Sequence, residues 1–468
     1  MEDNGYRNEE TPKKGLWHII DSIEGDKVIW IIVLLLILIS VLAIFSSTPL
    51  LSEASRIEIM KSHGGVAIFG LAMIFLMYKF ITKIGIYRVL SQLGFLVTFA
   101  LLLILDFHAD LGFLKAQYIN GAWRTLSLFG FQIHVFEVAK VAMVMYLAWA
   151  LHSFKQDSEA IREGKESPTF GLANRLAESK TFAFLKKPFW KRVFYIYGPA
   201  LLICGMIAPG SNSSAIFVAI IMIGTMLIGG VPFRELILAG AALVVMAGIL
   251  AGIHKASDGE FMPRLKTFFN RMEAEYDTEA LEGLKPGTKQ FYDALDDIRQ
   301  PYGAKVAIHE GGLLGKGSGN STQKYSVTHI YSDYMFSFLI EEYGLFGGIL
   351  IVILYISLIA RSSMIARLCG NEFAKIAIGG LAFLITGQAF MHMLVNVDII
   401  PMTGQTLPLI SDGASAFLMS CLAFGVILSI SRMAKKKIQT VEESAMTRPL
   451  DEIQERITIL EQIEDETA

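Results

Sequence analysis

The stretch "VIWIIVLLLILISVLAIF" at Val28–Phe45 decides the fold class of this chain. It carries no charged residue, and it is long enough to cross the hydrocarbon core of a bilayer as one helix. A bilayer offers no partner to an unpaired backbone N–H group, so the run must be helical. A polar, charged segment precedes it and no small-residue cleavage site follows it. We therefore expect a membrane span rather than a cleavable signal peptide.

The rest of the chain repeats this pattern. Of the 468 residues 53% are hydrophobic and only 18% are charged, which is too few charges for a soluble protein of this length. We predict an all-α polytopic membrane protein with about ten transmembrane helices. These apolar segments lie near residues 28–47, 64–82, 88–106, 134–152, 193–208, 213–230, 233–253, 331–360, 374–396 and 413–432.

The distribution of lysine and arginine orients these spans. Basic residues gather in alternate gaps, and the segment after the last span opens with "RMAKKK" (432–437). The positive-inside rule then places both termini in the cytoplasm. The predicted organisation is a cytoplasmic tail at 1–27, a transmembrane domain at 28–433 and a cytoplasmic tail at 434–468. Residues 254–330 form a long extracytoplasmic loop between spans 7 and 8.

Composition gives no reason to expect a nucleic-acid partner or a metal site. The net charge is −3, and the three cysteines, Cys204, Cys369 and Cys421, lack metal-ligand spacing. We interpret the cysteines as small packing residues in a protein without disulfides.

Charged residues inside apolar spans are candidates for function because they are costly there. Glu137 and Lys140 lie one turn apart on the fourth span and can pair. Either the pair fixes helix packing, or it lines a polar cavity open to the outer face. Other charges near that face are Arg124, Asp333, Glu341, Glu342, Asp398 and Asp412.

The glycine stretch "HEGGLLGKGSGNSTQK" (309–324) is typical of a loop that holds a phosphate. It fails the nucleotide-binding P-loop pattern, because Glu310 and Gly317 stand where glycine and Ser or Thr are required. Glycines still let backbone N–H groups approach an anion, and Lys316 and Lys324 add positive charge. The alternatives are a lipid phosphate ligand and a tight turn without a ligand.

Four sequence blocks together resemble the SEDS family, the polytopic glycosyltransferases of bacterial cell-wall synthesis. They are "NGAWRTLSLFGFQIHVFEVAK" (120–140), the glycine stretch, "YSDYMFSFLIEEYGLFGG" (331–348) and "PMTGQTLPLISDGASA" (401–416). They occur in the family's order, and the resemblance covers most of residues 20–435. The opening span resembles the division-type FtsW more than the elongation-type RodA. Trp123, "APGSNSS" (208–214) and Asp412 depart from the family's patterns.

The resemblance implies an inverting glycosyltransferase that polymerises lipid II and releases undecaprenyl pyrophosphate. A carboxylate takes the proton of the attacking sugar hydroxyl, and cationic or N–H groups stabilise the diphosphate leaving group. The family's key aspartate lies in the long outer loop. A gap-free match of "YDALDDIRQPYGAKVAI" (292–308) puts it at Asp293, and a small gap selects Asp296 or Asp297 instead. We rank Asp293 first and Asp297 second as the catalytic residue.

The remaining expectations concern substrate and partners. The residues expected to bind substrate are Arg124, Glu137, Lys140, Lys316, Gln323, Lys324, Asp333, Glu342 and Ser411. A divalent cation could bridge diphosphate and carboxylate, although no ligand spacing requires one. The expected partners are lipid II, a class B penicillin-binding protein and other division proteins, at the septum of the bacterial inner membrane. The rival interpretations are a flippase for lipid-linked sugars, an elongation-type polymerase and a non-catalytic scaffold.

Overall fold

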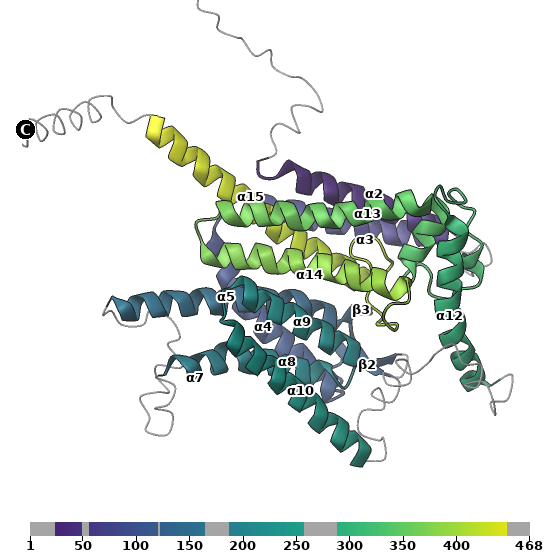
Figure 1. Cartoon of the computed structure of the whole chain (residues 1–468), viewed down its shortest axis with the longest axis horizontal. Helices are drawn as coiled ribbons and strands as arrows, with labels where there is room; N and C mark the ends of the chain where they lie inside the picture. Colours follow the sequence, from purple (N-terminus) through teal and green to yellow (C-terminus); the bar gives the residue numbers. More distant parts are fainter. Residues whose placement is uncertain (1–23, 49–55, 120–121, 164–186, 257–287, 447–468) are drawn as a thin grey trace, which may run out of the picture.

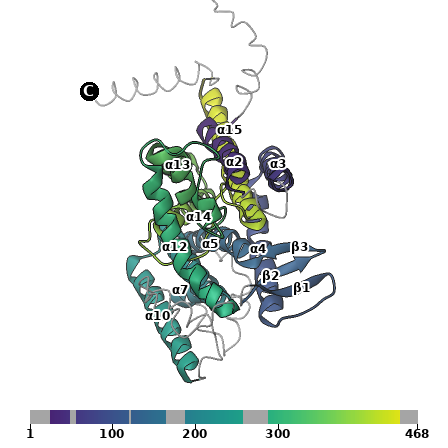
Figure 2. The same cartoon turned by 90° about the vertical axis from the view of Figure 1, so that its right-hand side faces the viewer.

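The computed structural model describes residues 24–48, 56–119, 122–163, 187–256 and 288–446, and in it long helices run side by side in one bundle (Figure 1). A quarter turn shows a small sheet projecting from the edge of this bundle (Figure 2). Seven of the described helices are long and apolar enough to cross a membrane. The prediction of a polytopic membrane protein is therefore confirmed, while the count of ten spans stays a prediction. The seven are α2 (Lys27–Ser47), α3 (Arg56–Phe80), α4 (Ile84–Asp106), α5 (Val135–Arg162), α13 (Met335–Leu368), α14 (Glu372–Asn396) and α15 (Ala414–Met446).

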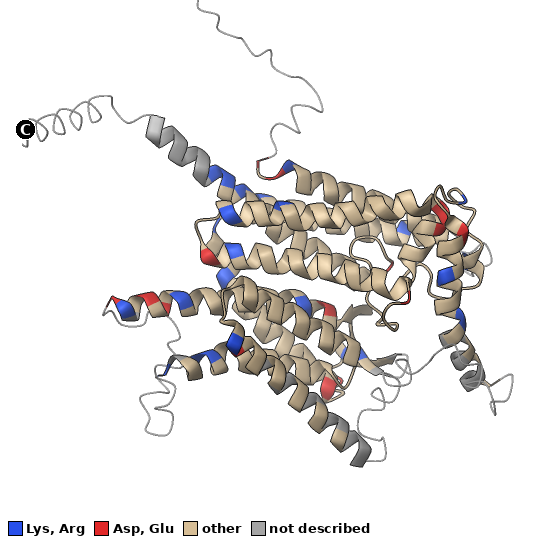
Figure 3. Ribbon diagram, viewed as in Figure 1, with Lys and Arg blue, Asp and Glu red and all other residues tan. Residues whose placement is uncertain are grey.

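Other helices complete the bundle. They are α7 (Pro188–Arg192), a π-helical turn at Val193–Tyr197, α8 (Gly198–Ile207), α9 (Asn212–Ile228), α10 (Phe233–Ala256) and α12 (Lys289–Gly311). The helices α5 and α14 are the most deeply buried of the candidate spans, and they pack against each other and against α9. Charged residues gather at the two ends of the bundle and leave its middle almost uncharged (Figure 3).

The first span begins at a side-chain cap. One carboxylate oxygen of Asp26 accepts hydrogen bonds from the backbone N–H groups of Val28 (2.9 Å) and Ile29 (3.1 Å). This cap satisfies two of the N–H groups that the first helical turn leaves without partners. The other carboxylate oxygen accepts from Arg361 on α13 at 2.5 Å. The start of α2 is thereby tied to a second helix.

The described chain begins and ends at the same end of the bundle. The backbone N–H of Asp26 donates to Ser431 Oγ on α15 at 2.9 Å, and Arg432 pairs with Glu24 at 2.9 Å. Figure 1 shows the start of α2 and the far part of α15 at the same end. This arrangement agrees with the even number of crossings expected from the sequence.

A three-stranded antiparallel sheet corrects the prediction of an all-α protein. Its strands are β1 (Leu114–Ile119), β2 (Ala122–Leu128) and β3 (Phe131–His134), in the order β1-β2-β3. Apolar and polar residues alternate over Leu114–Gln117 of β1 and Leu126–Leu128 of β2, as they do in strands with one buried face. Leu114, Ala116 and Leu126 are buried. The sheet fills the connection between α4 and α5.

A helix also occupies part of the expected long loop. Helix α12 covers Lys289–Gly311, packs against α13 and lies across the end of the bundle (Figure 1). Pro301 lies inside it and lacks the N–H group that a helix interior normally uses. Residues 257–287 of the expected loop lie outside the described part.

The glycine stretch packs against a kink in α13. Gly344 has a φ of 70°, which glycine adopts without the strain that a side chain brings. A Cβ atom at Gly344 would also collide with the carbonyl of Leu313. Around this kink, Lys316 N donates to the carbonyl of Glu341 (2.8 Å), and Gly317 N donates to that of Glu342 (2.9 Å). Backbone hydrogen bonds therefore hold residues 311–324 against the start of α13.

Candidate active site

A buried lysine on α5 is the centre of a polar network. Lys140 Nζ lies 2.6 Å from Glu137 Oε1, 2.9 Å from Gln388 Oε1 and 2.8 Å from Gln405 Oε1. An ammonium group has three donors, so these three acceptors use all of them. The Phe217 ring lies 5.5 Å from the same nitrogen. The pairing of Glu137 with Lys140 that their spacing predicts is confirmed.

The network joins three segments that are distant in the sequence. Gln388 is on α14, and Gln405 lies in residues 397–413, which we name the connecting segment because it links α14 to α15. Gln405 also donates to Ser214 Oγ on α9 at 3.1 Å, and its backbone carbonyl lies 2.8 Å from His392 Nδ1. A buried charge satisfied from several elements fixes the positions of those elements.

A buried acid, Glu341, holds the glycine stretch in place. Glu341 is fully buried at the start of α13, and its carboxylate accepts from Lys316 Nζ (2.8 Å) and Ser321 Oγ (2.5 Å). It also accepts from the backbone N–H groups of Thr322 (2.8 Å) and Gln323 (3.2 Å). With the hydroxyl of Thr322 (3.0 Å), five donors from one short stretch converge on one carboxylate, as they do in a preorganised anion site.

A second buried acid, Glu342, joins the glycine stretch to α2. The carboxylate of Glu342 accepts from Ser46 Oγ at 2.7 Å and from the backbone N–H of Gly319 at 2.9 Å. Lys324 is buried beside it and donates to the carbonyls of Gly319 (2.8 Å) and Ser46 (3.2 Å). The lysines and the N–H groups of the glycine stretch named above therefore donate their hydrogen bonds to oxygen atoms of the protein itself.

Outside the spans, Lys316 also pairs with the exposed acid Glu310. Hydrogen bonds from Lys316 and Thr322 lower the pKa of Glu310 below its ordinary value of 4.5. Burial lowers the pKa of Lys316, but the carboxylates of Glu310 and Glu341 outweigh it and raise that pKa above 10.5. Both groups therefore remain charged at neutral pH.

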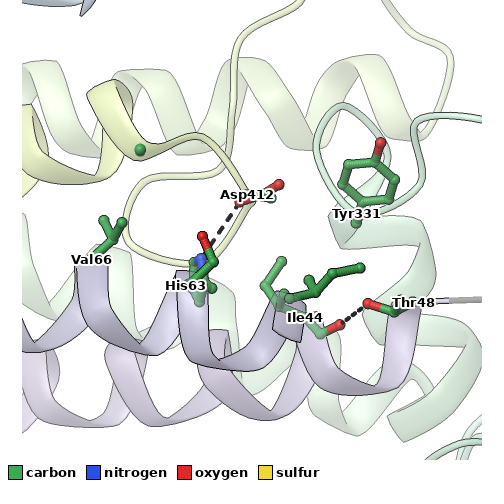
Figure 4. Close-up of a pocket in the computed structure, with 9 residues that line it drawn as sticks. Ile44, Thr48, His63, Val66, Tyr331 and Asp412 are labelled. Atoms are coloured by element: carbon green, nitrogen blue, oxygen red, sulfur yellow. Dashed lines mark hydrogen bonds and ion pairs between the residues drawn. The ribbon is translucent and has the colours of Figure 1, made fainter. Parts of the chain in front are cut away.

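A cavity of about 270 Å³ opens between α2, α3 and the connecting segment (Figure 4). His63 on α3 lies in its wall, with Nδ1 3.6 Å from Asp412 Oδ1 and Nε2 2.7 Å from Ser40 Oγ. Ser40 Oγ donates its only proton to the carbonyl of Ile410 at 2.9 Å, so His63 Nε2 is the donor toward Ser40. Asp412 is 44% exposed and Tyr331 also lines the cavity. The Nδ1 atom of His63 therefore faces the Asp412 carboxylate.

The connecting segment also contacts residues 331–333, which lead into α13. Ser411 Oγ donates to the carbonyl of Ser332 at 2.8 Å, and Asp412 N donates to that of Tyr331 at 2.9 Å. The carbonyl of Asp333 accepts from Asn396 at the end of α14 at 3.0 Å. Arg124 lies half-buried on β2, at the edge of the bundle. The structure thus brings Lys140, Ser411 and Asp333 to one connected region, and places Arg124 on the neighbouring sheet.

The three candidate catalytic aspartates lie on α12 rather than in an irregular loop. Asp293, Asp296 and Asp297 are three and four residues apart, so they share one face of this helix. Their side chains lie outside the described part. Lys305, about 12 Å further along α12 from Asp297 at 1.5 Å per residue, pairs with Asp398 of the connecting segment at 2.5 Å. Helix α12 is therefore joined to the same segment as Lys140.

The sequence pattern did not indicate several residues of this region. Gln388 and Gln405 are the partners of Lys140, and Ser40 and His63 line or support the cavity. An amide or imidazole inside an apolar span is the signal that could have identified Gln388 and His63. No local pattern joins Ser40 to Ile410, which lies 370 residues away.

Within the described ranges, no group of three or more His, Cys, Asp or Glu side chains is placed to hold a metal ion. The divalent cation stays a prediction. Cys204, Cys369 and Cys421 are buried free thiols.

The family model for the cell cycle proteins FtsW, RodA and SpoVE matches residues 26–436. The chain therefore belongs to the SEDS family that the four blocks resemble. A probable peptidoglycan glycosyltransferase FtsW from Methylomonas methanica is 29% identical over 320 residues, which are 67% of this chain and 69% of that protein.

Solved structures share the fold. The rod shape determining protein RodA of Thermus thermophilus aligns with a TM-score of 0.52 and 19% identity, over 88% of this chain and 98% of that one. A chain from a structure described as the coordination of polymerization and crosslinking by a peptidoglycan synthase complex aligns with a TM-score of 0.54 and 20% identity, with the same coverage.

Proposed function

We propose that this protein is a peptidoglycan glycosyltransferase that polymerises lipid II into glycan strands during cell division. The observation that carries the proposal is the family match over residues 26–436. The geometry adds a connecting segment that contacts the buried Lys140 through Gln405 and the partly exposed Lys305 of α12 through Asp398. Such a region suits the transfer of a sugar from a diphosphate-linked lipid.

Each step of the proposed reaction is assigned to particular residues of this region. An aspartate of α12, with Asp293 first and Asp297 second, removes the proton from the attacking sugar hydroxyl. The diphosphate leaving group develops charge, and Arg124 stabilises it, joined in the substrate-bound state by Lys316 and Lys324. Lys140 already has three acceptors, so it acts by holding Gln405 and Glu137 in place. The leaving group is already acidic, so a second carboxylic acid is not required.

The glycine stretch has a different place in this proposal. Its described N–H groups and lysines bind Glu341, Glu342 and nearby carbonyls. We therefore assign residues 309–324 to the support of the site first. Contact of Lys316, Gln323 and Lys324 with the lipid diphosphate is a prediction for the substrate-bound state.

The proposed orientation places α12, the glycine stretch and the sheet outside the cytoplasm. The clustered lysine and arginine residues at the other end then face the cytoplasm, as the positive-inside rule requires. The proposed location is the inner membrane at the division septum. A class B penicillin-binding protein is the proposed partner, and the peptidoglycan synthase complex among the structural neighbours supports it. Other division proteins and elongation-type activity are alternatives for the cellular role.

Polymerisation of purified lipid II tests this function. The full chain and a class B penicillin-binding protein are reconstituted in liposomes, and glycan products are separated by length. We expect Asp293→Asn or Asp297→Asn to abolish polymerisation. The control is Glu159→Gln, which changes an exposed acid near the C-terminal end of α5, away from Lys140, and should leave polymerisation unchanged. Full activity in Asp293→Asn, Asp296→Asn and Asp297→Asn would contradict the mechanism.

The same liposomes test the flippase alternative. Lipid II labelled on one leaflet is scored for transfer to the other leaflet. Transfer without polymerisation, unaffected by the aspartate substitutions, favours a flippase. Neither transfer nor polymerisation by a correctly folded protein with its partner favours a scaffold.

A further inference from the structure

The turn between β2 and β3 has an unusual residue. Phe129 and Gly130 form a two-residue turn with φ angles of 49° and 90°. Two positive φ angles are typical of the hairpin turn that favours Asn-Gly or Asp-Gly. A bulky side chain is strained in this conformation. Phenylalanine at the first turn position therefore needs a reason beyond the turn itself.

Phe129 belongs to a cluster of exposed aromatic side chains. Phe129 and Phe131 are each 78% exposed, and Phe113 is 54% exposed. The rings of Phe113 and Phe129 are nearly parallel, with centroids 6.1 Å apart. We name Phe113, Phe129 and Phe131 the aromatic tip. Hairpin turns that face water are normally polar, so an aromatic cluster at this position is unfavourable in water.

The position of the sheet indicates what covers this tip. Strand β1 follows the end of α4 and β3 leads directly into α5, and both helices are candidate membrane spans. The sheet therefore lies where two spans leave the bilayer. Exposed apolar residues continue along α4 through Leu93 and Leu96, and Phe107, directly after α4, is 78% exposed. The aromatic tip extends this lipid-facing surface to the membrane boundary.

We propose that the aromatic tip inserts into the interfacial layer of the membrane and anchors the sheet there. Phenylalanine rings are wholly apolar, so they gain free energy by leaving water for the boundary between headgroups and acyl chains. The neighbouring ion pair of Lys115 and Asp110, at 2.7 Å, gives the first strand a polar side toward water. The ligand of this surface is a lipid bilayer. The anchor fixes the height of β2, which carries Arg124, relative to the membrane.

Site-directed spin labelling tests the anchor in the full chain. The protein is reconstituted in phosphatidylglycerol and phosphatidylethanolamine nanodiscs, with a nitroxide at Phe129→Cys or, separately, Phe113→Cys. The collision rates with lipid-soluble oxygen and with a water-soluble nickel chelate report depth. Leu96→Cys on α4 is the lipid reference, and Gln132→Cys is the matched control because it is exposed and follows Phe131 on the opposite face of β3. The native cysteines are buried, and the unsubstituted protein measures their background.

We expect the oxygen-to-nickel ratio at both tip positions to shift from the value at position 132 toward that at position 96. A ratio equal to that at position 132 overturns the proposal. Protection from both reagents also overturns it, because it means that protein covers the tip.

A second substitution separates anchoring from turn geometry. Phe129→Asn suits the turn and removes one of the two most exposed rings of the aromatic tip. Combined with the label at position 113, it should shift that label toward the nickel reagent. No shift at position 113 means that the strands alone set its depth, which contradicts the anchor.

Discussion

Lys316 Nζ lies 2.8 Å from Glu341 Oε1, and this pair joins the glycine stretch to the kinked start of α13. Glu341 is completely buried, whereas the other acid that pairs with Lys316, Glu310, is on the surface. We therefore expect the two acids to contribute differently to the free energy of unfolding, although they contact the same ammonium group. The first prediction uses this difference.

Glu341→Gln should destabilise the fold far more than Glu310→Gln. A glutamine keeps the size of Glu341 but leaves Lys316, Ser321 and two backbone N–H groups facing a neutral and partly donating side chain. Breaking a buried pair costs about 3–5 kcal/mol, and thermal unfolding of the purified protein measures it. Glu310→Gln is the matched control and should change the unfolding temperature little. Equal effects of both substitutions would mean that burial of Glu341 has no energetic consequence.

The network of Lys140 should behave as one unit. Lys140→Met should abolish polymerisation and lower stability, because it leaves Glu137, Gln388 and Gln405 without their common donor. The double variant Glu137→Gln/Lys140→Met should be less destabilised than the sum of the single variants, by about 0.5–3 kcal/mol. Thermal unfolding of all four proteins measures this coupling. Additive losses would contradict a shared network.

Stability of the glycine stretch should depend on pH at both extremes. The pKa of Glu310 is lowered by Lys316, so its contribution is present above about pH 4.5 and is lost as pH falls through the lowered value. The pKa of Lys316 is raised, so its contribution is complete below about pH 10.5 and is lost as pH rises through the raised value.

Amide hydrogen exchange of residues 311–324, corrected for the intrinsic rate at each pH, checks this dependence. Protection should be constant between these limits and should fall outside them. Glu310→Gln should remove part of the acid limb and keep most of the alkaline limb, since Glu341 still pairs with Lys316. A protection profile that the substitution leaves unchanged would show that Glu310 is not the titrating group.

The cavity of Figure 4 offers a fourth prediction. His63→Phe removes the hydrogen bond to Ser40, which keeps its own bond to the carbonyl of Ile410, and should cost about 0.5–1.5 kcal/mol, the net contribution of one hydrogen bond. Asp412→Asn should affect stability less, because Asp412 is partly exposed and lies 3.6 Å from His63. If the cavity holds part of the substrate, both substitutions raise the KM for lipid II. Unchanged kinetics with a lowered unfolding temperature would limit His63 to a structural role.

Particular elements show how far the sequence predicts this structure. The apolar runs predict α2, α4 and α14 correctly, because only a helix satisfies the backbone in lipid. The spacing of Glu137 and Lys140 predicts their contact, because residues three apart share a helix face. The strands β1 to β3 were not predicted, because each is only four to seven residues long and lies between strong helical signals.

The candidate site was predicted less completely. Helix α12 was expected as a loop, since its polar sequence and Pro301 resemble a connection. Gln388 and Gln405, which accept hydrogen bonds from Lys140, lie 248 and 265 residues from it in the sequence. A single sequence contains no signal that pairs such distant positions. Glu341 and Glu342 accept hydrogen bonds from the glycine stretch because the kink at Gly344 places them beside it. The sequence alone does not predict this kink.

The packing of α15 along α3 has a consequence for biosynthesis. Gly70 on α3 faces Cys421 on α15, and the rings of His63 and Phe417 lie 5.5 Å apart. The ribosome completes α15 long after α3 has left the insertion machinery. Until then the face of α3 that α15 covers must remain in contact with lipid or with an insertase, and the polar His63 makes lipid the costlier of the two. A chain that stops after α14 therefore leaves this assembly step unfinished, and membrane quality control can distinguish it from the complete protein.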